Sequence, residues 1–234
     1  MNIKRLALAA GAALTLAACA IGKPIPQATT YVVDPPRVQA ASPVARRPET
    51  LRMGNVRVAA AYASNALVYR LDDVQYTSDP YNAFIADPGA MLGNRMAEWL
   101  DRAGPFSTVA QPGSARPAPY VLEAAVAELY GDFRDGRRPA AVLAVQFTLI
   151  DQTEARPKVV RECTITRRVD LPQASPDALV RGYGEALAQI LSQLVPELSA
   201  GTSEQPAASA ALTAARRTEG AAPQVSDVTS PVSR

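Results

Sequence analysis

Histidine is absent from this 234-residue chain, and cysteine occurs only twice. The absence of histidine excludes Ser-His-Asp and Cys-His catalysis, and it excludes metal sites built on imidazole ligands. Charge of one sign is also lacking, because 24 basic residues nearly balance 22 acidic ones and leave a formal net charge of +2. This balance removes the electrostatic argument for binding nucleic acid. Most common classes of enzyme and of nucleic-acid-binding protein are therefore disfavoured.

Local motifs for chemistry are missing as well. The sequence contains no Gly-x-Ser-x-Gly motif, Walker loop or dinucleotide fingerprint. Residues 132–136 lack the alternating Asp spacing and the closing Glu of a calcium loop, so they are interpreted as a polar hairpin turn. The pairs Arg137–Arg138 and Arg167–Arg168 are too sparse for a phosphate-tracking surface and are interpreted as solvated strand ends. We expect no catalytic residue, no cofactor and no metal; a hydrolase working without histidine remains a third alternative.

The first residues have the pattern of a targeting signal. Lys4 and Arg5 precede an apolar run over residues 6–17, which is too short to span a bilayer as a stable helix. The run ends in Leu16-Ala17-Ala18-Cys19, which resembles a bacterial lipobox. The resemblance implies cleavage before Cys19 and a diacylglycerol thioether on its thiol; the alternative is a plain signal peptide with an unrelated cysteine. Three acyl chains would hold the protein at a membrane essentially permanently.

The residue after the cysteine indicates the membrane to which such a lipoprotein is sorted. It is Ala20 rather than Asp, and the sorting rule of such lipoproteins then implies the outer membrane, with the body facing the periplasm. Lipidation of Cys19 would leave Cys163 without an intramolecular partner, so we expect no disulfide framework. Cys163 is interpreted as a small apolar strand residue.

Composition divides the chain into four regions. Residues 1–18 are the predicted signal peptide, 19–50 a Pro-rich tether, 51–198 one folded body, and 199–234 a disordered tail rich in Ala, Ser, Pro and Thr. Prolines keep the tether extended, apart from a short strand predicted at residues 31–33. If that strand pairs with the body, the free tether is about ten residues, or ~30 Å at polyproline-like rise.

Periodicity and caps predict the elements of the body. One helix is predicted to begin at Pro88, after the N-cap Asp87, and to end at Gly104. A second follows the cap Ser175 and carries an apolar stripe to Leu198, with Gly182 and Gly184 permitting close contact with a sheet. Strands are predicted at residues 56–59, 66–70, 74–77, 106–109, 120–130, 140–150 and 159–169. The expected fold class is α+β: a mixed, largely antiparallel sheet with two amphipathic helices packed on one face.

Aromatic residues make up only 6% of the chain, and five of them lie within a stretch of 23 residues, from 62 to 84. Large amphipathic rings of this kind serve either as interface anchors or as core filling, and the sequence leaves both alternatives open. The candidates for a partner interface are Tyr69, Tyr76, Tyr81 and Phe84, with Tyr62 belonging to the same cluster.

The body resembles a known family. The residues that carry the resemblance are Ala66-Leu67-Val68-Tyr69-Arg70, Tyr76, Asp79-Pro80-Tyr81, Phe84, Pro88, Leu100, Gly104-Pro105-Phe106, Val109, Tyr120-Val121-Leu122-Glu123 and Glu128-Leu129-Tyr130-Gly131-Asp132-Phe133. With their order of elements they are similar to the ABC-type transport auxiliary lipoprotein family. The similarity spans residues 50–198 and rests on packing residues rather than on a catalytic signature.

The resemblance implies a role and partners. Members of this family are expected to serve mammalian-cell-entry (MCE) type lipid transport systems, in which an ABC permease and ATPase work with a periplasmic MCE-domain protein. The auxiliary lipoprotein would meet the MCE protein at the outer membrane, as a homo-oligomeric ring, with no chemistry of its own and no nucleic acid. The runner-up hypothesis is a structural or assembly lipoprotein that binds an envelope polymer or a barrel protein. Peptidoglycan binding usually needs an Asp/Arg pocket, and the sequence alone does not locate one.

Overall fold

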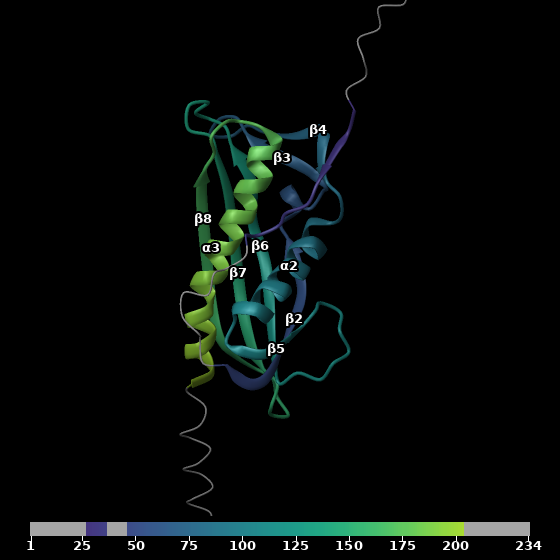
Figure 1. Cartoon of the computed structure of the whole chain (residues 1–234), viewed down its shortest axis with the longest axis vertical. Coiled ribbons are helices and arrows are strands. Elements are labelled where there is room, and N and C mark those ends of the chain that lie inside the picture. The colour runs from purple at the N-terminus through teal and green to yellow at the C-terminus, as the bar shows by residue number, and fades with distance from the viewer. Residues whose placement is uncertain (1–26, 37–45, 204–234) are drawn as a thin grey trace, which may run out of the picture.

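A computed structural model describes residues 27–36 and 46–203 (Figure 1). The predicted signal peptide, Cys19 and residues 204–234 of the predicted tail lie outside the described residues. In chain order the elements are β1 (Thr29–Tyr31), β2 (Arg47–Val58), η2 (Ala60–Tyr62), β3 (Ala66–Arg70), β4 (Tyr76–Phe84), α2 (Pro88–Ala103), β5 (Phe106–Ala110), β6 (Tyr120–Asp132), β7 (Ala140–Asp151), β8 (Lys158–Asp170) and α3 (Pro176–Ser203).

Strand β6 is the centre of an eight-stranded mixed sheet. One edge of β6 pairs along its length with β7, which pairs in turn with β8, and both of these long ladders are antiparallel. The other edge is shared: β2 pairs with its first half and β3 with its end, both in parallel. Beyond β2 lies β5, and beyond β3 lie β4 and then β1. The predicted α+β class with a mixed, largely antiparallel sheet is confirmed.

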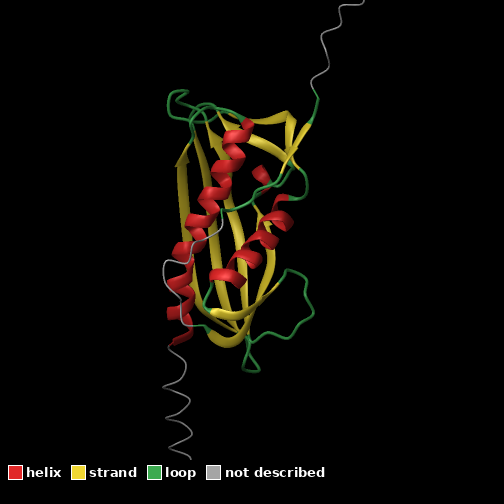
Figure 2. Cartoon of the chain, viewed as in Figure 1, coloured by secondary structure: helices red, strands yellow, loops and turns green. Residues whose placement is uncertain are grey.

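Both helices cover the same face of the sheet (Figure 2). Helix α2 packs on β2 and β5, and α3 packs on β7 and β8. Strand β7 shows why this face is apolar: Leu143, Val145 and Phe147 are almost fully buried beneath the helices, whereas Gln146 points to the other face and is exposed. Alternate side chains of a strand point to opposite faces, so the period-two pattern of the sequence located the core correctly.

The helix starts follow from local capping. The Asp87 carboxylate accepts a hydrogen bond from the Ala90 N–H at 2.8 Å, and Pro88 occupies the first helical position, where its missing N–H costs nothing. Ser175 caps α3 by accepting from the Ala178 N–H at 3.3 Å. The predicted starts and the end of α2 are therefore confirmed.

Glycines bring α3 close to its neighbours, but not both in the predicted way. A Cβ at Gly182 would lie 2.8 Å from the Ala141 Cβ of β7, so this glycine permits close contact with the sheet, as expected. A Cβ at Gly184 would lie 2.6 Å from the carbonyl oxygen of Asp34, which belongs to the N-terminal segment and not to the sheet. The expectation for Gly184 was wrong because it did not anticipate a segment crossing over α3.

That segment, residues 29–36, is here called the N-terminal strap. Its β1 strand pairs in parallel with β4, two residues earlier than the predicted strand at 31–33. Val33 is fully buried and its N–H points to the Met91 sulfur at 3.5 Å, while the Asp34 carboxylate lies 3.8 Å from the Arg95 guanidinium. The strap therefore lies within the range predicted as tether and is packed against α2 and α3.

Two strands are longer than predicted by several residues. Strand β2 begins at Arg47 rather than at residue 56, because irregular register at two places interrupts the alternation by which strands are recognised. Strand β4 reaches Phe84 although it contains Pro80, which lies where the register with β3 shifts. Proline is tolerated at such irregularities because it need not donate to the ladder.

Candidate functional site

Three loops come together at one end of the sheet, which is here called the loop end. They are residues 71–75 between β3 and β4, 133–139 between β6 and β7, and 171–175 between β8 and α3. Strands β3 and β6 are parallel and finish side by side, with Arg70 opposite Asp132. Strand β8 ends at the same level, since Asp170 lies opposite Ala140. The fold thus gathers charged residues that are up to 100 positions apart in sequence.

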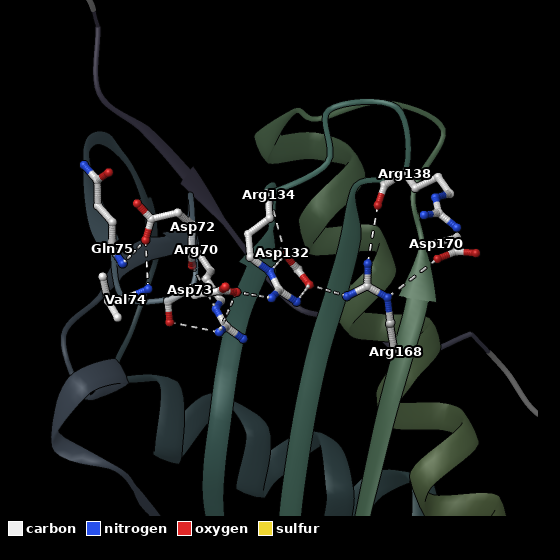
Figure 3. Close-up of polar contacts among 10 residues, drawn as sticks. All are labelled: Arg70, Asp72, Asp73, Val74, Gln75, Asp132, Arg134, Arg138, Arg168 and Asp170. Atoms are coloured by element: carbon white, nitrogen blue, oxygen red, sulfur yellow. Dashed lines mark hydrogen bonds and ion pairs between the residues drawn. The ribbon is translucent and has the colours of Figure 1, made fainter.

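Asp132 is the centre of the polar contacts at the loop end (Figure 3). Its carboxylate is 3% exposed and accepts hydrogen bonds from Arg134 Nε and Nη2, each at 3.0 Å, and from Arg168 Nη1. The Arg134 hydrogen bonds, helped by Arg168, hold the pKa of Asp132 well below its usual range despite its burial. Asp132 therefore stays ionised and ties the β6–β7 turn to β8.

The β3–β4 loop is fixed to the same network. The Asp72 carboxylate accepts from the N–H groups of Val74 and Gln75 at 2.8 and 2.6 Å, and these bonds lower the pKa of Asp72. Arg134 Nη1 donates to the Asp73 carboxylate at 2.7 Å. Arg70 donates to two carbonyl groups of the loop, those of residues 72 and 73. The tip of the loop is thus held from both sides in one conformation (Figure 3).

A hollow of about 530 Å³ opens between these charges. Its lining comprises Asp132, Arg134, Asp135, Arg138, Arg168 and Asp170. Three of these residues are acidic and three are basic, and the buried Asp132 carboxylate is already paired with two arginines. The hollow therefore has no large excess of either charge. The sequence pattern predicts a hairpin turn and solvated strand ends for these residues. The turn is polar as expected, but Arg168 is paired with Asp132, a partner that only the strand register could have revealed.

The four aromatic residues proposed for an interface are placed in different surroundings. Phe84 is 3% exposed and packs near Tyr183 in the main core. Tyr69 is half-buried and stacks on Phe133 with 5.0 Å between ring centroids. Tyr76 and Tyr81 are 43% and 46% exposed. The positions of Tyr76 and Tyr81 suit a contact surface, whereas that of Phe84 suits core filling.

Tyr69 holds the irregular part of β4 in place. Its hydroxyl donates to the Asp79 carboxylate at 2.6 Å, and that carboxylate also accepts from the backbone N–H groups of Tyr81 and Asn82. Burial, followed by the bond to Asp79, raises the pKa of Tyr69. Burial alone would raise the pKa of Asp79, but the hydrogen bonds outweigh it and lower that pKa. The backbone around Tyr81 is therefore anchored, which presents its ring in a defined position.

Exposed large apolar side chains are concentrated in the same part of the molecule. Among the described residues they are Val32, Leu71, Val74, Tyr76, Tyr81, Ile85 and Val159. All but Val159 lie in or beside β1, the β3–β4 loop and β4. Five of these residues form two groups. Leu71 and Val74 are called the loop tip, and Val32, Tyr81 and Ile85 are called the edge set. Such concentrations of exposed apolar surface mark sites of contact with proteins or membranes.

Metal-binding and thiol chemistry in the described part of the chain depend on its acidic and cysteine side chains. Residues 27–36 and 46–203 contain no group of three or more acidic or cysteine side chains placed to hold a metal ion. Cys163 is half-buried, and burial raises the pKa of its thiol, which disfavours the reactive thiolate. No helix within these ranges is long and apolar enough to cross a membrane.

Taken together, the fold is that of a two-helix α+β domain with a fixed loop end and an apolar sheet edge. The crystal structure of protein XCC0632 from Xanthomonas campestris matches it with a TM-score of 0.65 at 18% sequence identity, covering 76% of this chain and 99% of that one. The crystal structure of an uncharacterized protein matches with a TM-score of 0.57 at 20% identity, covering 74% and 99%. At these identities the likeness shows a shared fold alone.

A more distant match is a PelC variant dodecamer from Paraburkholderia phytofirmans, with a TM-score of 0.41 at 24% identity, covering 66% of this chain and 92% of that one. At this TM-score the likeness carries no argument about assembly. No curated protein matches the chain.

The family is nevertheless defined. The family model of the ABC-type transport auxiliary lipoprotein component matches residues 31–195, a range that runs from the end of β1 almost to the end of α3. The chain therefore belongs to this family, as its resemblance predicted.

Proposed function

We propose that this protein is a non-catalytic component of an MCE-type lipid transport system, anchored in the outer membrane and facing the periplasm. The observation that carries the proposal is the family match over residues 31–195, which includes most of the described body. Within such a system an ABC permease and ATPase would supply the energy, and this lipoprotein would position the periplasmic MCE-domain protein near the outer membrane.

The anchor in this proposal is the acylated Cys19. The Leu16-Ala17-Ala18-Cys19 motif and the following Ala20 support it, together with membership of a lipoprotein family. Replacing Cys19 with Ser would remove the acceptor thiol, so we expect loss of palmitate labelling and release from the outer-membrane fraction. Labelling equal to that of the wild type would overturn the anchor.

The contact with the MCE protein is assigned to the edge set. Tyr81 and Ile85 are 46% and 62% exposed beside β1, a strand of only three residues at the edge of the sheet. Exposed aromatic and aliphatic side chains on an anchored backbone are suited to docking, because little conformational entropy is lost when they are covered. The protein would bind its partner through this edge while the buried face remains unchanged.

A matched pair of variants tests this contact. Tyr81→Ala should reduce recovery of the MCE-domain protein after mild crosslinking in cells, with little change in melting temperature, because the ring is half exposed. Phe84→Ala is the control: its ring is 3% exposed, so it should lower the melting temperature through a core cavity. Undiminished recovery of the partner with Tyr81→Ala would contradict the assignment.

The second candidate, a lipoprotein that binds an envelope polymer, is favoured by one feature of the loop end. The hollow around Asp132 and Arg168 is an Asp/Arg pocket of the general kind that could receive the ammonium and carboxylate groups of a peptidoglycan peptide. Cosedimentation with purified peptidoglycan distinguishes the two candidates. Retention by peptidoglycan that is lost in Arg168→Ala would favour the second, whereas capture of the MCE protein without such retention would favour the first.

A further inference from the structure

We propose that the loop end faces the outer membrane and that the loop tip, Leu71 and Val74, contacts the phospholipid surface. This inference deepens the proposed function and rests on its acylated Cys19. It concerns a different surface from the edge set, which the proposed function assigns to the protein partner.

The direction of the strap orients the molecule. Strand β1 is parallel to β4, and β4 is antiparallel to β3, so β1 runs away from the end at which β3 finishes. The N-terminal end of β1 therefore points toward the loop end, and β1 begins on that side of the molecule in Figure 1. An anchor upstream of Gln27 consequently draws the loop end, rather than the opposite end, toward the bilayer.

The short segment between Cys19 and Gln27 limits how the body can be oriented at the membrane. The segment from Cys19 to Gln27 contains eight peptide steps, which span at most about 29 Å when fully extended. Strand β8 alone runs 13 residues from the far end to the loop end, a distance of ~40 Å at about 3.3 Å per residue. The far end, where β8 begins and α3 finishes, is therefore held away from the membrane in an upright molecule.

The loop tip has the chemistry of a shallow membrane contact. Val74 is 89% exposed and Leu71 is 40% exposed. The Asp72 side chain accepts a hydrogen bond from the Val74 N–H, and Arg134 holds the loop through Asp73, so the loop backbone is held in a conformation that exposes these apolar side chains. Apolar groups presented in this way insert among lipid headgroups and acyl chains, and rigid presentation reduces the entropy cost.

The charges around the loop tip are balanced, which suits contact with zwitterionic lipid headgroups. Asp72 and Asp73 stand against Arg70 and Arg134, so positive and negative groups nearly cancel. Such a rim neither repels a zwitterionic phosphoethanolamine surface nor depends on anionic lipid for attraction. A lipid surface accounts for both the apolar tip and the balanced rim.

The test measures lipid contact at Val74 in the acylated, full-length protein. Cys163→Ser removes the second thiol, Val74→Cys introduces an attachment point for a nitrobenzoxadiazole fluorophore, and the protein is reconstituted into phosphatidylethanolamine–phosphatidylglycerol vesicles that carry a headgroup-proximal spin-labelled lipid quencher. Val159→Cys in the same background is the matched control, because Val159 is 54% exposed at the far end of β8. We expect quenching at position 74 to exceed that at position 159 by about twofold or more, as shallow insertion requires.

The outcomes separate the inference from the proposed function. If the labelled protein does not float with the vesicles, the anchor fails and the proposed function fails with it. If the protein floats but the two positions are quenched equally, the anchor stands and the membrane contact of the loop tip is overturned. A photocrosslinker at position 74 that captures the MCE protein or a second copy of this chain in cells, in place of phospholipid, would overturn it as well.

Discussion

The helix-covered face and the loop end are stabilised in opposite ways. Beneath α2 and α3 the sheet is apolar and closed, with Leu143, Val145 and Phe147 removed from water. At the loop end the backbone is held by a buried carboxylate between two arginines, while apolar side chains such as Val74 remain in solvent. Apolar burial therefore builds the body, whereas polar contacts at the loop end fix a shape that leaves apolar groups available for contact.

The largest effect is expected from the helix-covered face. Leu143→Ala removes a side chain that is 0% exposed between β7 and the helices, so the free energy of unfolding should fall by about 2–5 kcal/mol. Chemical denaturation measures this loss. Gln146→Ala, on the exposed face of the same strand, is the control and should change stability by less than about 0.5 kcal/mol. Equal losses in both variants would contradict the proposed division between the faces.

A smaller effect is expected from the charge network. Asp132→Asn removes the carboxylate shared by Arg134 and Arg168, whose side chains are 39% and 45% exposed. Because both arginines can regain water, the loss should be about 1–2 kcal/mol rather than the larger penalty of a fully buried pair. Loss of the network should also raise amide hydrogen exchange in residues 71–75. An unchanged exchange rate there would show that the network does not fix the loop.

Protonation of Asp132 at low pH should reproduce the loss of stability caused by Asp132→Asn. The pKa of Asp132 is lower in the folded protein than its usual value of 3.8, so its contribution to stability is complete above that value and is lost progressively as the pH falls from 3.8 toward the lower folded-state pKa. The difference in unfolding free energy between wild type and Asp132→Asn should therefore be constant above about pH 5 and narrow below about pH 4. A difference that is undiminished at pH 2 would assign the effect to packing.

The smallest effect on stability is expected at the loop tip. Val74→Ser alters a side chain that is 89% exposed, so the melting temperature should stay within about 1 °C of the wild type, a shift well below that of a 1 kcal/mol change. The same variant should lose fluorescence-detected lipid contact of a label placed at Leu71. A large drop in melting temperature would mean that Val74 supports the fold and is not free for contact.

Local signals predicted most of the body. Helix α2 was located by its capping aspartate, its first proline and its terminal glycine, and β7 by strict alternation of apolar residues. Each of these signals lies within a few residues of the element that it defines, so no tertiary information was needed.

Non-local features were missed. A strand near the strap was predicted, but the packing of Val33 against α2 was not, and neither was the early start of β2 at Arg47; both segments lie in a Pro-rich stretch whose strand character comes from pairing with distant segments. The contact between Asp132 and Arg168 depends on the register of three strands, which no local pattern specifies. For the aromatic cluster, the sequence proposed candidates, but only the positions of the strands separate the exposed Tyr81 from the buried Phe84.

The strap also has a mechanical consequence. Under the proposed anchoring, any load on the acylated terminus enters the body at Gln27 and pulls β1 along its own axis, so the hydrogen bonds to β4 share the force in shear rather than opening one after another. Val33 and Asp34 pass the load on to α2, and the backbone against Gly184 passes it to α3. The attachment point is thus built into the load-bearing part of the domain, and a moving transport partner could pull on the body without peeling it from its anchor.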